Sequence, residues 1–99
     1  MTVSETKGEG MIQLSVDGNI DTNTAPRLQQ SLLAAFQKSK NVVLDLNTCP
    51  YLSSAGLRAL LIGQKTASSK GGSLKICNVQ EPVMKVFQMT KFDQVLNLS

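Results

Sequence analysis

The amino-acid sequence predicts an α/β fold, in which a mixed sheet of four to five strands has helices packed on it. Short segments with apolar residues at every second position alternate with longer segments whose apolar residues recur every three to four positions. Gly and Pro residues separate many of these segments. The chain has 99 residues, a length with room for one hydrophobic core, so we expect a single domain over residues 1–99.

The first two elements are predicted strands joined by a tight turn. Apolar and polar residues alternate over 11–16, which is typical of a strand with one buried face. Residues 2–7 contain few apolar side chains, and the glycines of segment 8–10 can reverse the chain. We therefore expect an edge strand that runs antiparallel to the strand that follows it.

A helix is predicted over residues 25–38 and a central strand after it. Thr24 is a candidate N-cap, and Pro26 falls in the first turn, where proline is favoured. Residues 42–46 begin with three apolar residues in succession, which is typical of a strand buried on both faces. This strand should lie in the centre of the sheet.

The second half of the chain repeats this alternation. Apolar spacing predicts a helix over 54–69, ended by two glycines, and a strand over 74–79. Pro82 then opens a short helix that directs Val83, Val86 and Phe87 inward. Met84 and Met89 are interpreted as core residues, with an adaptable contact surface as the alternative. Residues 92–98 fit either a final helical turn or an edge strand.

The composition argues against several classes of function. The net charge is +3, but the basic residues are scattered along the sequence, which indicates solvated faces and no nucleic-acid site. No apolar run is long enough to span a membrane and no signal segment opens the chain, so we expect a cytoplasmic protein with no direct membrane insertion.

Histidine is absent, and only two cysteines are present. The usual general base of nucleophilic catalysis and the commonest metal ligand are therefore missing, and two thiols cannot complete a four-cysteine zinc site. We expect no catalytic residue, no metal and no cofactor. Cys49 and Cys77 each lie near the end of a predicted strand and are interpreted as structural thiols of a reducing compartment.

The junction between the central strand and the second long helix is the candidate functional site, because open α/β sheets present functional groups at the carboxyl ends of their strands. Ser53 and Ser54 stand at this junction, where serine commonly caps a helix. Gly56 follows in the first helical turn at a cost of about 1 kcal/mol relative to alanine. A close approach of neighbouring groups is expected to require this glycine.

Three segments together resemble one known family. Residues 44–61 are similar to the signature of the STAS domain, specifically of the small bacterial anti-sigma factor antagonists. Residues 17–28 resemble a second element of that family, which precedes its first helix, and residues 71–76 resemble a later strand. The resemblance covers nearly the whole chain and implies the STAS fold.

The resemblance implies a switch in which one protein changes partners when it is phosphorylated. In the family, the unphosphorylated antagonist binds an anti-sigma factor that is also a serine kinase of the GHKL type, and the sigma factor is released. The kinase then inactivates the antagonist by phosphorylating a serine, and a serine phosphatase removes the phosphate. The acceptor position of the family falls on Ser54, and Ser53 stands where many members carry an acidic residue, so Ser53 is the alternative acceptor.

The residues that the resemblance places at the partner surface surround this acceptor; they are Asp21, Ser53, Ser54, Gly56 and Arg58. Asp21 is explained equally well as a cap of the turn before the first helix or as a residue that recognises the partner. If its loop lies beside Ser54, it also repels a phosphate there. Arg58, one turn after Ser54, either pairs with that phosphate or is a solvated helix residue.

Three other functions fit the same residues. STAS-like domains also serve as accessory subunits of membrane transport or lipid trafficking systems, and a partner switch can act outside transcription. A small hydrolase that uses Ser54 with Asp21 or Lys65 as its base ranks last, because no histidine assists the serine. We therefore expect a regulatory module that is not an enzyme.

Overall fold

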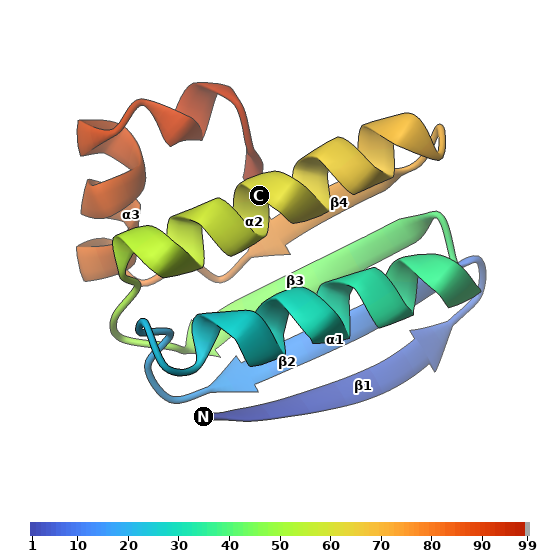
Figure 1. Ribbon diagram of the computed structural model, residues 1–99, viewed down its shortest axis with the longest axis horizontal. Helices are drawn as coiled ribbons and strands as arrows, with labels where there is room; N and C mark the ends of the chain where they lie inside the picture. Colours follow the sequence, from blue (N-terminus) through green and yellow to red (C-terminus); the bar gives the residue numbers. More distant parts are fainter. Residues whose placement is uncertain (99) are drawn as a thin grey trace.

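The computed structural model describes residues 1–98, which form one five-stranded sheet (Figure 1). The spatial order of the strands follows their order in the sequence. β1 pairs antiparallel with β2, and every later pairing is parallel. The strands are β1 (Thr2–Gly8), β2 (Met11–Asp17), β3 (Asn41–Thr48), β4 (Ser73–Cys77) and β5 (Asn97–Leu98). The mixed α/β architecture predicted from the sequence is confirmed.

The two long helices lie side by side on the same face of the sheet, and a shorter helical segment lies beyond one end of β4 (Figure 1). α1 (Ala25–Lys38) and α2 (Ser54–Ser69) have the bounds that the sequence predicts. α3 (Glu81–Met89) and the 3-10 turn η1 (Phe92–Gln94) follow β4. Residues 92–98 thus contain both of the structures that the sequence allows, a helical turn and a short edge strand.

The hydrophobic core lies between the two long helices and the sheet. Its largest fully buried side chains are Phe36 of α1 and Phe87 of α3, in a cluster with leucine, isoleucine and valine from the sheet and the helices. The alternating residues of β2 point into it as predicted, with Ile12, Leu14 and Val16 buried. This packing holds the carboxyl ends of β2 and β3 together at one end of the molecule.

β3 lies in the centre of the sheet as predicted, but the prediction that both of its faces are buried is wrong. Val42, Leu44 and Leu46 are buried, whereas Val43 and Asp45 are only half-buried. The physical reason is that α1 and α2 cover one face of the sheet. A strand can therefore start with three apolar residues and still have one open face.

Two further predictions are corrected. β4 ends at Cys77, two residues before the predicted end, because Asn78 adopts a left-handed backbone conformation with φ of 56°. Met89 is 84% exposed, so its interpretation as a core residue is wrong, whereas Met84 packs partly against the core. Val86 is likewise half-buried on the inner side of α3.

Candidate functional site

The loops that follow β2 and β3 are joined along their length by backbone hydrogen bonds. The N–H of Ile20 donates to the carbonyl oxygen of Tyr51 at 3.0 Å, and the N–H of Ser53 donates to the carbonyl oxygen of Ile20 at 2.8 Å. Ile20 and Leu52 form a parallel bridge beyond the end of the regular sheet. The loop that carries Asp21 therefore lies directly beside the loop that leads to Ser54.

Ser53 is the N-cap of α2. Its backbone is extended, with φ of −84° and ψ of 172°, and its Oγ accepts a hydrogen bond from the N–H of Gly56 at 3.2 Å. This bond satisfies one of the backbone donors that a helix leaves unpaired at its start. The Ser53 hydroxyl is half-buried and already has a structural role.

Ser54 is the first residue of α2, and its surroundings differ from those of Ser53. The residue is exposed, and its hydroxyl makes no hydrogen bond to any residue within 1–98. It stands where the helix dipole and the free N–H groups of the first turn favour a negative charge. Of the two serines, Ser54 is the one whose oxygen a second protein can reach without breaking the helix cap.

Gly56 is buried beneath the same loops. A Cβ at this position would lie 2.5 Å from Cδ1 of Leu52 and 2.7 Å from Cγ2 of Ile20. The expected close approach is therefore present, and it involves one side chain from each of the two joined loops. Because Gly56 is buried, a second protein cannot contact it directly, and it influences the surface above it only through the position of the loops.

The carboxylate of Asp21 is bound within its own loop. Its Oδ1 accepts hydrogen bonds from the N–H groups of Asn23 and Thr24, each at 2.9 Å. The hydrogen bond from the Thr24 N–H is the main cause that lowers the pKa of Asp21 from its ordinary value of 3.8. The capping role considered for Asp21 is thus present in the structure, and its charge stays on the surface beside the Ser54 loop.

Thr24 occupies the N-cap position of α1, but its side chain does not cap the helix as predicted. Its hydroxyl accepts from the N–H of Asp21 at 2.8 Å and donates to the carbonyl oxygen of Asn19 at 3.0 Å. Asp21 and Thr24 therefore bind each other reciprocally. The loop before α1 is ordered by these bonds in place of a helix cap.

Arg58 is exposed one turn after Ser54, at the edge of a shallow groove of about 280 Å³ between α2 and the chain that follows α3. The groove is lined by Ser54, Leu57, Arg58, Leu61, Thr90 and Phe92. Thr90 and Phe92 are absent from the residues that the sequence indicated, because only the tertiary fold brings them beside α2. No local motif in the sequence signals their position.

Cys49 lies buried in the loop between β3 and α2, where its Sγ is 3.3 Å from the carbonyl oxygen of Tyr51. Burial raises the pKa of this thiol, which keeps it protonated near neutral pH. Both cysteines are free. Within residues 1–98, no group of three or more Cys, Asp or Glu side chains is arranged to hold a metal ion.

The chain matches a known family over nearly its whole length. The family described as "STAS domain" matches residues 3–99. The chain belongs to the STAS domain family. The resemblance drawn from the three sequence segments is thereby confirmed, as is the STAS fold that it implied.

Relatives of this chain include proteins named as anti-sigma factor antagonists. The chain is 27% identical over 99 residues to the anti-sigma-B factor antagonist of Bacillus subtilis, a match that covers 100% of this chain and 91% of that protein. It is 33% identical over 93 residues to BtrV of Bordetella bronchiseptica, which is named as a proposed anti-sigma factor antagonist; this match covers 93% of the chain and 80% of BtrV.

Solved STAS structures agree with the same architecture. An anti-sigma factor antagonist from Mycobacterium paratuberculosis has a TM-score of 0.87 and 26% identity, over 98% of this chain and 83% of that one. The phosphorylated form of the Bacillus protein SpoIIAA has a TM-score of 0.76 at 12% identity, over 99% of this chain and 91% of that one. The second likeness is one of fold alone.

Proposed function

We propose that this protein is an anti-sigma factor antagonist that is switched off by phosphorylation of Ser54. In its unphosphorylated state it binds an anti-sigma factor that is also a GHKL-type serine kinase, and the sigma factor is released. A serine phosphatase restores the active state. The observation that carries this proposal is the contrast between Ser54, exposed with a free hydroxyl within the described residues, and Ser53, whose hydroxyl caps α2.

The names of the STAS relatives support the partner class, and the geometry of the site supports the acceptor. The joined loops and the first turn of α2 form one continuous surface on which Asp21, Ser54 and Arg58 are all accessible. A kinase must bring its nucleotide to an exposed hydroxyl. Ser54 meets that requirement without any change in the backbone hydrogen bonds of the loops.

The proposed role of Ser54 is that of a substrate and not of a nucleophile. A serine nucleophile needs a hydrogen-bonded base, and no side chain within residues 1–98 forms such a bond to Ser54. The protein is thus proposed as a non-catalytic regulatory module of the cytoplasm. No helix in residues 1–98 is both long enough and apolar enough to cross a membrane.

Phosphorylation would change the charge of this surface more than its structure. A phosphate adds about 1.5 to 2 negative charges near neutral pH. Its position at the start of α2 is favourable for the fold, because the N–H groups and the helix dipole stabilise an anion there. On a surface that contacts a neutral hydroxyl, the same phosphate adds bulk, a desolvation cost and negative charge beside that of the Asp21 carboxylate. Affinity for the kinase should therefore fall while the fold remains intact.

The decisive experiment is to map the phosphorylated residue. The protein is incubated with its cognate kinase and ATP, and then examined by intact-mass and tandem mass spectrometry. We expect one phosphate on Ser54 in the wild type and in Ser53→Ala, and none in Ser54→Ala. Phosphate on Ser53 would overturn the assignment of the acceptor. No phosphate with an active kinase would overturn the switch itself and favour an accessory subunit of a transport or lipid trafficking system.

A further inference from the structure

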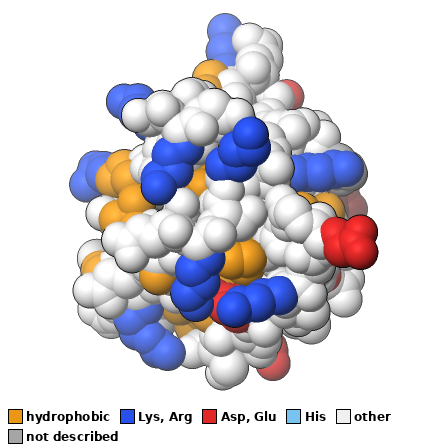
Figure 2. Space-filling model, turned by 90° about the vertical axis from the view of Figure 1, so that its right-hand side faces the viewer, with side chains coloured by type: hydrophobic (Ala, Val, Ile, Leu, Met, Phe, Trp, Pro, Cys, Tyr) orange, Lys and Arg blue, Asp and Glu red, His pale blue; other side chains and the backbone are white. Residues whose placement is uncertain are grey.

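Lysines that are scattered in the sequence gather at one end of the folded molecule. This end, opposite Ser54, is where α1 and α2 finish and where β2, β3 and β4 begin (Figure 1). Seen from this side, basic side chains outnumber acidic ones, and polar and apolar surface lies between them (Figure 2). We call this surface the basic end; its lysines are Lys7, Lys38, Lys40, Lys65 and Lys70, all exposed.

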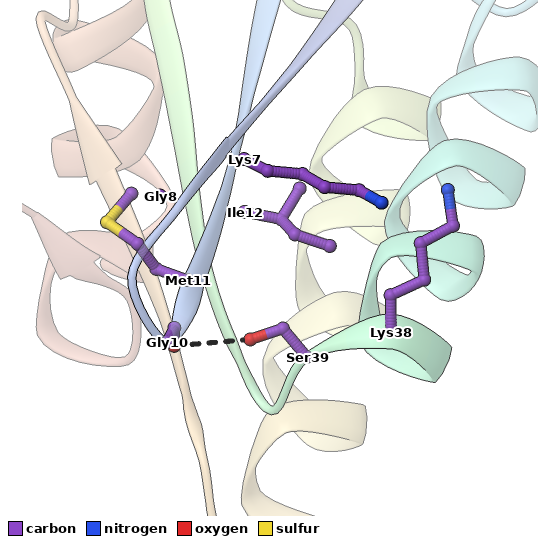
Figure 3. Close-up of a pocket in the computed structure, with 7 residues that line it drawn as sticks. All are labelled: Lys7, Gly8, Gly10, Met11, Ile12, Lys38 and Ser39. Atoms are coloured by element: carbon purple, nitrogen blue, oxygen red, sulfur yellow. Dashed lines mark hydrogen bonds between the residues drawn. The ribbon is translucent and has the colours of Figure 1, made fainter.

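Each half of the basic end is built from neighbouring segments. The turn between β1 and β2 faces the last turn of α1 across a hollow of about 190 Å³, and Lys7 and Lys38 extend along its two sides (Figure 3). The Oγ of Ser39 donates to the carbonyl oxygen of Gly10 across the same gap at 3.3 Å. On the other half, Lys65 and Lys70 border a shallow hollow at the end of α2.

The two halves meet where the chain leaves each long helix. The N–H of Ser73 donates to the carbonyl oxygen of Lys40 at 3.0 Å. A Cβ at Gly72 would overlap that same carbonyl group, so only glycine permits the two connections to lie this close. Lys40 and Lys70 are thereby held on a single surface.

The basic end carries the whole net charge of the protein. Its five lysines less Glu5 and Glu9 leave a charge of +3, which equals the net charge of the chain. The rest of the molecule is neutral, because five basic and five acidic residues cancel there; these are Arg27, Arg58, Lys75, Lys85 and Lys91 against Asp17, Asp21, Asp45, Glu81 and Asp93.

Helix stability explains only part of this arrangement. Lys38 in the last turn of α1 and Lys70 at the end of α2 complement the negative ends of the helix dipoles. Lys7, Lys40 and Lys65 have no such role. Lys38 also pairs with Glu5 at 3.2 Å, whereas the other four lysines have no carboxylate within 4.0 Å among residues 1–98.

The chemistry of the basic end fits a diffuse anionic surface. Its basic residues are all lysines, which present point charges on flexible side chains. A planar arginine guanidinium, which binds one phosphate or carboxylate through two hydrogen bonds, is absent from this end. The basic end also has no aromatic side chain on which nucleic-acid bases could stack. Half-buried Met11 and Ile62 are among the residues that line the two hollows, and they add apolar contact without forming a deep cleft.

We propose that the basic end docks the protein reversibly on an anionic lipid bilayer. Clustered lysines near a charged membrane surface each contribute to binding, and their attraction weakens as salt shortens the Debye length. Along the axis of α2, Lys65 lies about 16 Å and Lys70 about 24 Å from Ser54. A docked molecule would therefore direct the Ser54 loop away from the lipid, so this docking is independent of the proposed phosphorylation.

Flotation with lipid vesicles tests the proposal. Vesicles of phosphatidylcholine with roughly one quarter phosphatidylglycerol are compared with vesicles of phosphatidylcholine alone, at low salt and at about 0.5 M NaCl. We expect the wild type to float only with the anionic vesicles and only at low salt. The variant with Lys7, Lys40, Lys65 and Lys70 each changed to Gln should lose at least about tenfold in partitioning.

A matched control variant tests whether vesicle binding depends on where the lysines lie or only on the net charge of the protein. The control variant removes the same charge from the rest of the molecule, by changing to Gln the residues Arg27, Lys75, Lys85 and Lys91. This variant should float nearly as well as the wild type. Circular dichroism checks that both variants are folded. Equal loss in the two variants, or no flotation of the wild type, would overturn the proposal. Retention of a DNA duplex without flotation would overturn it in favour of nucleic acid.

Discussion

At the scale of single residues, Ser53 and Ser54 are adjacent and chemically identical, yet the start of α2 gives them different tasks. The Ser53 hydroxyl accepts a hydrogen bond from Gly56, whereas Ser54 projects from the first turn into solvent. A residue that caps a helix contributes to the free energy of unfolding, whereas an exposed serine in the first turn contributes little. The two roles are therefore separable by experiment.

We predict that Ser53→Ala lowers the free energy of unfolding by about 1 kcal/mol, because the N–H of Gly56 loses its acceptor. Ser54→Ala should change it by less than about 0.5 kcal/mol. Urea denaturation followed by circular dichroism measures both. Ser53→Asp is the control that restores a capping oxygen, and its stability should return to near that of the wild type. Equal losses for the two alanine variants would contradict the assignment of the cap.

The pH dependence of stability tests the bonds of Asp21. Its pKa is lower in the folded protein than in the unfolded chain, so the stability from its ionised form is fully present above the ordinary value of 3.8 and is lost as pH falls through the lower folded pKa. In Asp21→Asn, the deficit in unfolding free energy should be constant near neutral pH and shrink in acid. A deficit that grows as the pH falls would contradict this account.

At the scale of elements, the packing between the first turn of α2 and the two joined loops holds the site in place. Gly56 lies at the point where Ile20 and Leu52 contact the helix. The helix would gain from alanine at this position if its propensity alone mattered. The space around Gly56 makes alanine unfavourable instead. Ile20 and Leu52 cannot move aside easily, because their two loops are joined to each other by backbone hydrogen bonds.

We predict that Gly56→Ala lowers the free energy of unfolding by about 1 to 3 kcal/mol despite its better helix propensity. It should also slow phosphorylation of Ser54 by displacing the loops. Gly63→Ala, farther along α2, is the matched control: its Cβ would lie 3.1 Å from Leu74 Cδ2 and 3.2 Å from Leu32 Cδ1, where small shifts relieve the contact. Thermal denaturation and a kinase assay compare the two. An unchanged or more stable Gly56→Ala would show that the loops yield easily.

The sequence predicts the bounds of α1 and α2 because their start and stop signals are local. Pro26 and Ser53 stand in the first turn or the cap, and two glycines end the second helix. The tail is not predictable in this way, because β5 exists only through its pairing with β4. The prediction for β3 is wrong because of Val43. This apolar side chain lies on the open face of the sheet, so three apolar residues in succession do not require burial of both faces.

Within the site, the sequence indicates the residues but not how they are bonded. Asp21 and Ser53 lie in loops whose pairing depends on the register of β2 with β3. Thr24 has the residue type of a helix cap, yet the reciprocal bonds with Asp21 compete successfully for its hydroxyl. The groove residues Thr90 and Phe92 and the grouping of the lysines depend on contacts that no short window of sequence contains.

At the scale of the whole molecule, charge is separated between two ends. The basic end holds the net +3, and phosphorylation of Ser54 would make the opposite, neutral part negative. We predict that the phosphorylated protein stays folded, with a free energy of unfolding within about 1 kcal/mol of that of the unmodified protein. Urea denaturation of the purified phosphorylated form measures this. Loss of cooperative unfolding would show that the switch acts by disrupting the structure.

The sheet order β1-β2-β3-β4-β5 has a consequence for folding during synthesis on the ribosome. Each strand pairs with the one synthesised just before it, so no strand waits for a neighbour that is still inside the ribosome. The β1–β2 hairpin can form first, and each later helix and strand adds to the growing edge. β5 is added after them and pairs with Lys75 and Ile76 of β4, so residues 1–98 can assemble in the order in which they emerge.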